Sequence, residues 1–556
     1  MLIEIFAALI PLGWLMPNHY SPWLSAWSDG ATMAILMLLV LSLTVKFAAH
    51  AQVSRPLLAL VILCVLTPCA QFAFGKIFYV GDVAVVILYV GMWLLAILAG
   101  SLLVKVNDGG DGVNWLAAGW ALAAIMSVAI AFSQWTGSID FGFYSVDLPP
   151  GKRPFANVAQ PNQFNTLCFF GLCGLLVLHQ TQRINKYIFW FSAVLVLCGM
   201  VLSQSRTGWI QIFFLILWGG LSKWRIELRF RKIELFALAA VFLIGTFTLT
   251  AISDALMLSV ERTLDGQLEM GLRASYWEAM LNALRHEPLW GYGWQQVGAA
   301  QLKVALDQKA LGIYFAHSHN LILDLLLWNG IPLGILMSVL AGWWLVQRAN
   351  SCLNPIAIWL MAAIGGFFIH GMLEFPHEYA YFLIPAGLAM GAADGLWTSQ
   401  QHLLRVSRGL VLCLLSTLSL LFSVIAVDYF SAEENYRTQQ LELARIGVSE
   451  LVTPVPKLYL LTQLSELLNT AHVDVNSSMT AAELERLRKV SVRFGYPATF
   501  QRYVEGLALN GNPEEAKQQM LILKSMWGDK IYTHIKNDIR ERAKSKYPAL
   551  DSLQLP

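Results

Sequence analysis

The fold is decided by stretches such as residues 80–104, which read VGDVAVVILYVGMWLLAILAGSLLV and contain one charged residue, Asp82. About 20 apolar residues in a helix cross the roughly 30 Å hydrocarbon core of a membrane. The stretch is long enough for that, and it lacks the polar–apolar alternation of a membrane-spanning strand. It therefore predicts a transmembrane helix rather than part of a barrel.

Similar apolar runs recur along most of the chain. We count about thirteen, near residues 2–17, 31–49, 56–73, 80–104, 113–136, 163–179, 187–203, 208–222, 234–253, 319–346, 355–373, 380–398 and 409–427. The first run and the run at 208–222 are short, so twelve or fourteen spans stay open as alternatives. The composition agrees, since 13% of the residues are charged, against roughly 25% in a soluble protein. We therefore predict an all-α polytopic membrane protein with about thirteen transmembrane helices.

Charge and cysteine content narrow the function classes. The formal net charge is +2 and no long basic run is present, which argues against a nucleic acid partner. The seven cysteines lie in or beside apolar runs, none follows Cys413, and no Cys/His spacing typical of a metal site occurs. We interpret the cysteines as small apolar residues, and we expect no disulfide in the polar C-terminal part.

The distribution of lysine and arginine predicts the orientation, because cytoplasmic loops carry an excess of these residues. With the N-terminus inside, the short outer loops contain Lys76, Lys152, Arg153 and Arg206. The inner loops contain a larger set: Lys46, Arg55, Lys105, Arg183, Lys186, Lys223, Arg225, Arg229, Arg231, Lys232, Arg348, Arg405 and Arg408. An odd number of spans then places the segment from Asp428 onward on the outer side.

That C-terminal segment is rich in Glu, Lys, Arg and Gln and carries signals of helix ends. Thr480 and Glu483 have the spacing of a capping box, in which each residue satisfies a backbone N–H of the other. Asn512-Pro513 followed by two glutamates predicts another helix start, and Gly528 predicts its end.

These features divide the chain into two expected domains. Residues 1–427 form a transmembrane domain with a large, partly amphipathic outer loop at 254–318. Residues 428–556 form a soluble helical domain that resembles helical repeats in its paired helices, although no clean repeat period is found.

Four outer segments carry polar residues that stand out against the apolar runs: 137–162, 204–208, 254–318 and 374–379. Since the predicted topology puts all four on one side of the membrane, we expect their side chains to converge.

Arg206 lies in a break between two apolar runs, Ser205-Arg206-Thr207-Gly208. An arginine at the centre of a spanning helix costs roughly 2.5–3.5 kcal/mol on insertion scales, and less near the interface. An arginine that snorkels or sets topology is the alternative, yet topology favours arginine on the opposite side. Because a guanidinium offers a planar fork of donors suited to phosphate oxygens, we predict that Arg206 binds an anionic substrate.

The longest outer loop contains two further candidate arginines, Arg262 and Arg273. Arg273 precedes an amphipathic stretch in which Trp277, Leu281 and Leu284 are spaced to share one face of a helix along the membrane. A solvated loop arginine is an equally weighted alternative for Arg273.

A histidine pair, His317 and His319, stands at the mouth of the next apolar run. A histidine in the first turn of a spanning helix can cap the helix, bind a metal or act as a general base, because its pKa is close to neutral. Position 323 is leucine, so the second ligand of a helical metal pair is missing. Asp324 either orients a neighbouring group or is a buried, hydrogen-bonded acid.

Together these segments resemble the O-antigen ligase and polymerase superfamily, and within it the bacterial O-oligosaccharyltransferases of the PglL type. The resemblance covers nearly the whole chain, and the ordered set of motifs is more specific than any one of them. The motifs are Arg153-Pro-Phe-Ala-Asn-Val-Ala-Gln160-Pro-Asn-Gln163, Ser203-Gln-Ser-Arg206-Thr-Gly208, Arg273 with Trp277 ahead of Pro288-Leu-Trp-Gly-Tyr-Gly293, Ala316-His-Ser-His319-Asn-Leu-Ile-Leu-Asp-Leu-Leu-Leu-Trp-Asn-Gly330 and Glu374-Phe-Pro-His-Glu-Tyr379-Ala-Tyr-Phe-Leu383.

The resemblance implies transfer of a preassembled glycan from undecaprenyl diphosphate to a hydroxyl group on the periplasmic side of the bacterial inner membrane. For this type the acceptor is a serine or threonine of a protein, often a type IV pilin, and neither metal nor other cofactor is used. Matched by motif, Arg206 and Arg273 would hold the diphosphate and stabilise the charge that develops as it leaves. His319 would take the proton of the acceptor hydroxyl, a choice over His317 that depends on the spacing to Asn320.

The motifs also assign residues to substrate binding: Gln160, Arg153, Asn162, His317, Asn320, Tyr379, Tyr381 and Glu374. Among these, Gln160 and one of the two tyrosines would position the substrates.

Other functions stay open at this point. The same enzyme class includes ligases that use a sugar of the lipid A core as acceptor, and repeat-unit polymerases. A lipid-glycan transporter predicts ionisable residues along a path through the bilayer and internal repeats, whereas the charges here concentrate on one face. A glycosidase-like pair among Glu278, Glu374 and Glu378 fits less well, because a diphosphate leaves without an acid.

Overall fold

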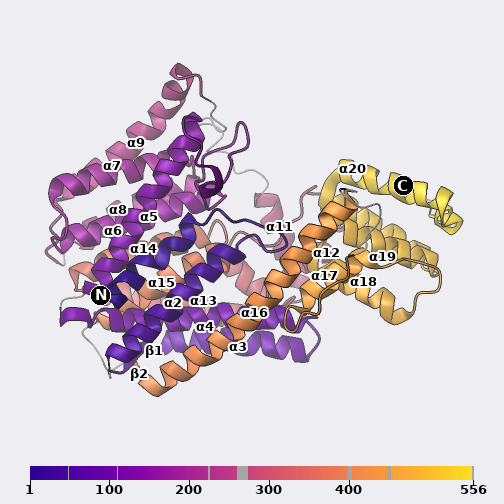
Figure 1. Ribbon diagram of the computed structural model, residues 1–556, viewed down its shortest axis with the longest axis horizontal. Coiled ribbons are helices and arrows are strands. Elements are labelled where there is room, and N and C mark those ends of the chain that lie inside the picture. The colour runs from indigo at the N-terminus through magenta and orange to yellow at the C-terminus, as the bar shows by residue number, and fades with distance from the viewer. Residues whose placement is uncertain are drawn as a thin grey trace. The chain divides into compact units, whose positions relative to one another are not determined.

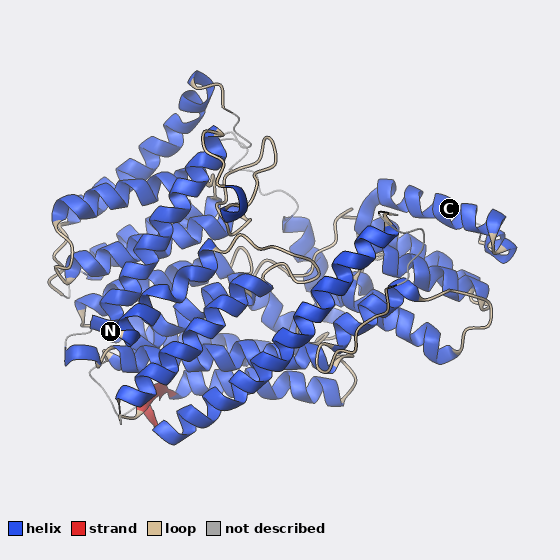
Figure 2. Ribbon diagram, in the orientation of Figure 1, coloured by secondary structure: helices blue, strands red, loops and turns tan. Residues whose placement is uncertain are grey.

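The chain is almost entirely helical in the computed structural model, which describes residues 1–47, 49–108, 111–222, 226–258, 273–397, 403–444, 446 and 453–553 (Figures 1 and 2). The α-helices are α1 Leu2–Leu9, α2 Ala26–Lys46, α3 Arg55–Ala73, α4 Val80–Leu103, α5 Asp111–Thr136, α6 Pro161–Gln180, α7 Lys186–Leu202, α8 Arg206–Ser222, α9 Lys232–Ala255, α11 Arg273–His286, α12 Val297–Lys303, α13 Leu321–Ser351, α14 Pro355–Gly371, α15 Ala380–Gly395, α16 Arg408–Leu443, α17 Thr462–His472, α18 Ala481–Phe494, α19 Pro497–Leu509 and α20 Pro513–Ser545. Short 3-10 turns lie at η1 Ile10–Leu15, η2 Val106–Asp108, η3 Gly142–Tyr144, η4 Pro376–Glu378 and η6 Pro548–Ser552. Arg262, a candidate from the longest outer loop, lies outside the described residues.

Each predicted apolar run contains a helix in the described residues, so the helical interpretation of these runs is confirmed. Eight of these helices are long and apolar enough to cross a membrane: α2, α3, α4, α5, α6, α9, α13 and α16. Others are shorter, such as α8 with 17 residues and α15 with 16. The chain is a multi-pass membrane protein, and the number of thirteen spans stays a prediction.

One pair of strands departs from the all-α expectation. In the described residues β1, Ala51–Ser54, pairs antiparallel with β2, Leu403–Val406 (red in Figure 2). The backbone N–H of Ser54 donates to a carboxylate oxygen of Asp394 at 3.0 Å, which fixes the ribbon to α15. Sequence periodicity misses a ribbon of this length because four residues give too little alternation to recognise.

The chain divides into two compact units, each made of three segments. Unit 1 comprises Met1–Leu63, Leu88–Glu269 and Val339–Phe422, and unit 2 comprises Cys64–Ile87, Met270–Ser338 and Ser423–Pro556. Each unit contains residues that pack against one another, whether they belong to apolar runs or to polar segments. The predicted domain boundary between residues 427 and 428 therefore stays a prediction.

Unit 1 is held by close helix packing around buried aromatic rings. Phe170 on α6 meets Trp120 on α5 edge to face at 5.0 Å between ring centroids, and it meets Trp14 at 5.9 Å. Edge-to-face pairs stabilise by about 0.5–1.5 kcal/mol beyond their buried area. Arg348 and Asp394 form a buried ion pair with 2.5 Å between nitrogen and oxygen.

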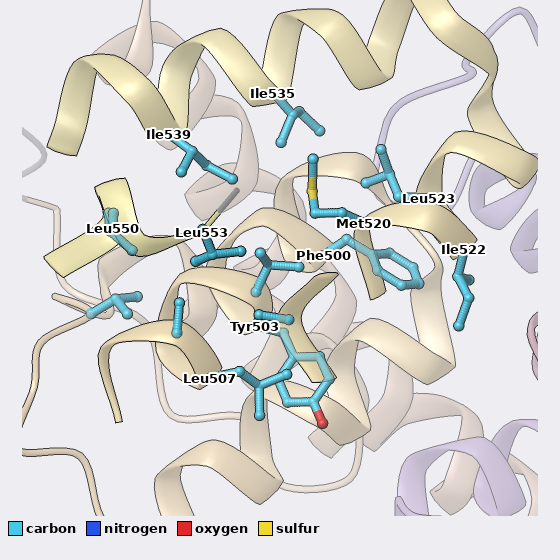
Figure 3. Close-up of a cluster of buried hydrophobic side chains, with 14 of the residues drawn as sticks. Phe500, Tyr503, Leu507, Met520, Ile522, Leu523, Ile535, Ile539, Leu550 and Leu553 are labelled. Carbon is cyan, nitrogen blue, oxygen red and sulfur yellow. The ribbon is translucent and has the colours of Figure 1, made fainter. Parts of the chain in front are cut away.

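Unit 2 has its own apolar core in the C-terminal helices. Figure 3 shows side chains of α19 and of both parts of α20 pointing toward one another, among them Phe500, Met520 and Ile535. The helix signals there are partly confirmed: the capping box of Thr480 and Glu483 is present.

The start and end of α20 give a mixed result. Asn512 stands at the N-cap position and Pro513 is the first residue of the helix, as predicted, although the side chain of Asn512 makes no capping hydrogen bond. Gly528 interrupts the helix with φ +77°, and a second helical part follows directly. Glycine adopts this conformation without the penalty that a Cβ brings.

Candidate functional site

Arg206 is the first residue of α8, at the predicted break between two apolar helices. α7 ends at Leu202, and Gln204 in the connection has φ +47°, a left-handed conformation that is uncommon for a residue with a side chain. Ser205 is oriented by a hydrogen bond from its backbone N–H to the hydroxyl of Ser203 at 3.2 Å. The half-buried Arg206 therefore starts at the positive end of a helix dipole, where anions bind favourably.

Arg153, in the loop that precedes α6, stabilises the connection between α7 and α8. Its side chain is 8% exposed, and its Nη1 donates to the backbone oxygens of Ser203 and Gln204 at 3.3 and 3.4 Å. These contacts fix the backbone next to Arg206. Arg153 therefore helps to position Arg206.

Asn162 joins three segments that are far apart in the sequence. Its Nδ2 donates to Glu374 at 2.9 Å, and its Oδ1 accepts a hydrogen bond from the hydroxyl of Ser205 at 2.8 Å. Gln160 caps the N-terminus of α6, because its side-chain oxygen accepts from the backbone N–H of Gln163 at 2.7 Å. The glutamine–proline–asparagine motif thus both starts a helix and connects the α7–α8 break with the α14–α15 connection.

Tyr379, at the N-cap position of α15, and Tyr381, in its first turn, lie together, with 5.1 Å between their ring centroids. The hydroxyl of Tyr381 donates to the side-chain oxygen of Gln163 at 2.8 Å, and Tyr379 also bonds to Gln163. Burial raises the pKa of Tyr379 well above its ordinary value, so its phenol stays protonated and can donate.

Sequence reasoning missed several residues of this cluster. Gln163 is quoted in a motif but received no role, and Ser205 was passed over beside Arg206. Asp29, 2% exposed in α2, accepts from the hydroxyl of Tyr89 at 2.6 Å and from the backbone N–H of Tyr381 at 3.3 Å. Asp29 stands two positions before the predicted run at 31–49, and a carboxylate at the edge of an apolar run is a signal that could have revealed it.

The histidine motif lies in unit 2, where hydrogen bonds to its backbone hold it in place. The hydroxyl of Tyr276 donates to the carbonyl oxygen of His317 at 3.1 Å, and the indole N–H of Trp277 donates to that of Ser318 at 2.8 Å. Both aromatic residues lie in the first two turns of α11, whose first residue is Arg273. Arg273 and the histidine motif therefore belong to one local structure.

Asp324 secures the same motif from α13. Its side chain is fully buried, and its Oδ1 accepts from the backbone N–H of Ser318 at 2.8 Å. Of the two interpretations offered by the sequence, the buried and hydrogen-bonded acid is confirmed. Burial raises the pKa of Tyr276 well above its ordinary value, which keeps that hydroxyl a donor to the segment.

His319 does not lie in the first turn of a helix, which corrects the sequence interpretation. α13 begins at Leu321, and Asn320 supplies the cap, since its side-chain oxygen accepts from the N–H of Leu323 at 3.1 Å. His319 precedes the cap with φ +56°. Asn320 takes the capping role because a short amide reaches the first-turn N–H groups better than an imidazole does.

The residues predicted to share one face of α11 are not equally buried. Tyr276, Ala279, Met280 and Leu284 are buried, whereas Leu281 is 55% exposed. The helix is turned toward the histidine motif because Tyr276 and Trp277 bond to it.

Backbone strain gathers at these segments. Eight residues other than glycine have positive φ in the described part of the chain, and four of them, Ala156, Ala159, Gln204 and His319, lie in the outer motifs. Such conformations persist where surrounding contacts enforce them, and they cluster at functional sites.

Two motifs separated in the sequence meet in unit 2. The helical pattern of α13 is interrupted at Gly330 with φ +77°, and the N–H of Tyr292 donates to the carbonyl oxygen of Leu327 at 2.7 Å. A Cβ at Gly330 would lie 2.3 Å from the carbonyl oxygen of Leu289, so only glycine fits here. The Pro288–Gly293 motif and the end of the histidine motif form one backbone junction.

The predicted residues thus fall into two clusters, each stabilised by hydrogen bonds. Unit 1 contains Arg153, Gln160, Asn162, Arg206, Glu374, Tyr379 and Tyr381, and unit 2 contains Arg273, His317, His319 and Asn320. A single pocket formed by both clusters stays a prediction. Among the described residues no group of three or more His, Cys, Asp or Glu side chains is arranged to hold a metal ion, and all seven cysteines are free.

Two family descriptions match this chain. Residues 191–338 match the family described as "O-Antigen ligase", which covers Arg206, Arg273 and His319. Residues 358–536 match the family described as "Virulence factor membrane-bound polymerase, C-terminal".

Two curated proteins of Acinetobacter baylyi are similar to the chain. One, named "General O-oligosaccharyltransferase", is 28% identical over 543 residues, which cover 95% of this chain and 92% of that protein. The other, named "ComP-specific O-oligosaccharyltransferase", is 26% identical over 492 residues, which cover 86% of each.

Proposed function

We infer that this chain, which belongs to the O-antigen ligase family and is a glycosyltransferase of the O-oligosaccharyltransferase type, transfers a preassembled glycan from a lipid diphosphate to a hydroxyl group of a protein. The observation that carries the proposal is similarity to such a transferase along 95% of the chain. The fixed backbone before Arg206 supports it, because it places this arginine, whose guanidinium suits a diphosphate, at the N-terminus of α8.

The finer assignments follow the chemistry of the two clusters. The acceptor oxygen bonds to the anomeric carbon of the glycan while the bond from that carbon to the diphosphate oxygen breaks, which inverts the configuration. Arg206 and Arg273 stabilise the negative charge that builds up on the leaving diphosphate. His319 takes the proton of the acceptor hydroxyl.

The remaining residues position these groups. Gln160 and Asn162 hold the start of α6 and the break at Arg206 together, and Asn320 fixes the start of α13 behind His319. Positioning of this kind contributes strongly to a reaction in which the leaving group needs only charge stabilisation.

The donor and acceptor are the undecaprenyl diphosphate-linked glycan and a serine or threonine of a periplasmic protein, with pilin-like proteins as first candidates. The protein lies in the bacterial inner membrane with both clusters on the periplasmic side. Fusions of a reporter enzyme at residue 316 test the orientation: activity of a reporter that works only in the cytosol would contradict it.

Reconstitution tests the reaction. Purified protein in detergent, lipid-linked glycan and an acceptor peptide are expected to give glycopeptide. Arg206→Ala and Arg273→Ala should each lower the rate by roughly 10²–10³-fold, and His319→Ala by roughly 10²–10⁴-fold. Arg285→Ala, an exposed arginine in the last turn of the helix that starts with Arg273, is the matched control and should leave the rate unchanged. Wild-type rates in all three site variants would refute the assignments.

A polymerase is the second candidate, because residues 358–536 match a family described as a membrane-bound polymerase. The same reconstitution without acceptor peptide separates the two functions: a polymerase lengthens the lipid-linked glycan, whereas a protein transferase leaves it unchanged. A transporter forms no product in either reaction.

A further inference from the structure

Tyr314, in the segment that leads to the histidine motif, is enclosed by the C-terminal helices of unit 2. Its ring stacks on Trp527 of α20, with 5.8 Å between centroids and 17° between planes. A Cβ at Gly495, the residue that ends α18, would lie 2.5 Å from the ring, and a Cβ at Gly298 of α12 would lie 2.2 Å from the hydroxyl oxygen. Trp527 is itself fixed, since its indole N–H donates to the carbonyl oxygen of Gly495 at 2.9 Å.

The backbone before Tyr314 is tied to the same helices. The N–H of Gly312 donates to the carbonyl oxygen of Ser525 at 2.9 Å, and the hydroxyl of Ser525 donates to the carbonyl oxygen of Ala305 at 2.7 Å. Gln301, 4% exposed, closes the turn by bonding to the backbone of both Ile313 and Phe315. The segment is therefore anchored through side chains and backbone together.

The next residue extends this anchor to the proposed general base. Phe315 stacks on Tyr276 at 4.0 Å between centroids, and its ring meets the edge of His319 at 5.8 Å and 87°. Tyr276 in turn donates to the backbone of His317. An unbroken series of contacts thus runs from Trp527 through Tyr314 and Phe315 to the histidine motif.

We propose that Tyr314 and Trp527 are positioning residues for the transfer reaction, so that the C-terminal helices α18 and α20 determine where His319 stands. The proposal builds on the function proposed above and adds a task for the C-terminal helices beyond any contact with an acceptor. The reason is mechanical: the histidine motif has strained backbone at His319, and strained conformations persist only where surrounding contacts hold them. Phe315, the residue after the anchored Tyr314, contacts His319, and Tyr276 holds the backbone of His317.

A kinetic experiment separates positioning from general stability. Tyr314→Ala should lower kcat roughly tenfold or more while KM for the lipid-linked donor changes less than about threefold, because a displaced catalytic group slows the reaction without removing a donor contact. Tyr314→Phe keeps the stacked ring and should restore most of kcat. Phe500→Leu is the control: it weakens the core of the same helices at a residue outside the contact series. Equal kcat losses in Tyr314→Phe and Tyr314→Ala, or in Phe500→Leu and Tyr314→Ala, would overturn the proposal.

A second measurement does not depend on glycan transfer. Ser318 is fully buried, so a single reporter cysteine, Ser318→Cys, in a chain whose seven native cysteines are replaced should react slowly with a water-soluble maleimide. Adding Trp527→Ala or Tyr314→Ala should raise the labelling rate by roughly tenfold, and adding Phe500→Leu should not. An unchanged labelling rate in both Trp527→Ala and Tyr314→Ala would refute the anchor even if transfer is active. Faster labelling in a protein that transfers no glycan would instead refute the proposed function and leave the anchor standing.

Discussion

The two clusters are held in different ways. In unit 1 the predicted side chains bond to other side chains: Asn162 to Glu374 and Ser205, and Tyr381 to Gln163. In unit 2 the bonds that fix the histidine motif involve its backbone: its carbonyl oxygens accept from aromatic donors on α11, and the N–H of Ser318 donates to Asp324 on α13. In unit 1, therefore, the candidate side chains themselves hold the local structure together. In unit 2 the surrounding residues hold the backbone of the histidine motif.

This difference has a consequence for mutational data. A loss of activity in unit 1 mixes lost structure with lost chemistry, because one side chain does both. In unit 2 the two can be separated, since structure is altered at Tyr276 or Trp277 while chemistry is altered at His319.

The largest expected effect tests the backbone bonds of unit 2. The double variant Tyr276→Phe with Trp277→Phe keeps an aromatic ring at each position but removes both donors. We expect transfer to slow by roughly 10²-fold, since a shift of about 1 Å in a catalytic group has that effect. Glycan transfer in detergent measures it, with the exposed Tyr187→Phe as control. A rate within twofold of wild type would show that the rings alone hold the motif.

The second prediction concerns Asn162, which bonds to Glu374 and Ser205. Asn162→Ala should lower the free energy of unfolding by roughly 2 kcal/mol, because two buried polar groups lose their partner. It should also lower transfer. Asn114→Ala is the matched control, since it removes one buried amide contact, to Thr181, elsewhere in unit 1. Thermal unfolding in detergent reads the stability, and a smaller loss in Asn162→Ala than in Asn114→Ala would contradict the bridging role.

The third prediction concerns pH and uses His377, which lies between Glu374 and Tyr379. Burial, together with the charge that His370 would carry, lowers the pKa of His377 to about 3. The unfolded state therefore binds a proton below its ordinary pKa of roughly 6.5, and the folded state does not. Stability is full above that pH and is lost as the pH falls toward 3.

A melting series checks this sign. The Tm of the wild type should drop between pH 7 and 5, and the drop should be smaller in His377→Phe. Glu378, whose carboxylate oxygen is 3.8 Å from the imidazole, opposes the effect if it is ionised. Glu378→Gln should therefore steepen the drop, and an identical pH profile in wild type and His377→Phe would exclude a buried neutral imidazole.

The smallest effect is expected from Tyr381→Phe, which removes one hydroxyl. The lost bond to Gln163 should lower the free energy of unfolding by about 1 kcal/mol, with a modest loss of transfer. Gln163→Ala should give a similar loss, and the double variant should be less than additive because both changes remove the same bond. If the two losses in the free energy of unfolding add fully in the double variant, the side chains of Tyr381 and Gln163 do not bond to each other.

The sequence predicted which segments are helices and which outer segments carry polar residues, because hydropathy and helix signals are local. The capping box at Thr480 and the buried acid Asp324 followed from the same rules. Asp29 and Phe315 were out of reach as site neighbours, since nothing local tells an acid or a ring which distant segment it will meet. His319 was placed in the first turn of the helix, but it lies two positions before α13, because Asn320 takes the cap position.

By itself the sequence determined a membrane-spanning helical chain with a set of motifs in a fixed order, since long apolar runs leave hydrogen bonding within helices as the only stable state of the backbone in lipid. Only the tertiary structure decided that Asn162 meets Glu374 across 212 positions and that Tyr314 fits between Gly298, Gly495 and Trp527. Those choices depend on shape and on paired donors and acceptors, and such complementarity exists only once separate helices have packed.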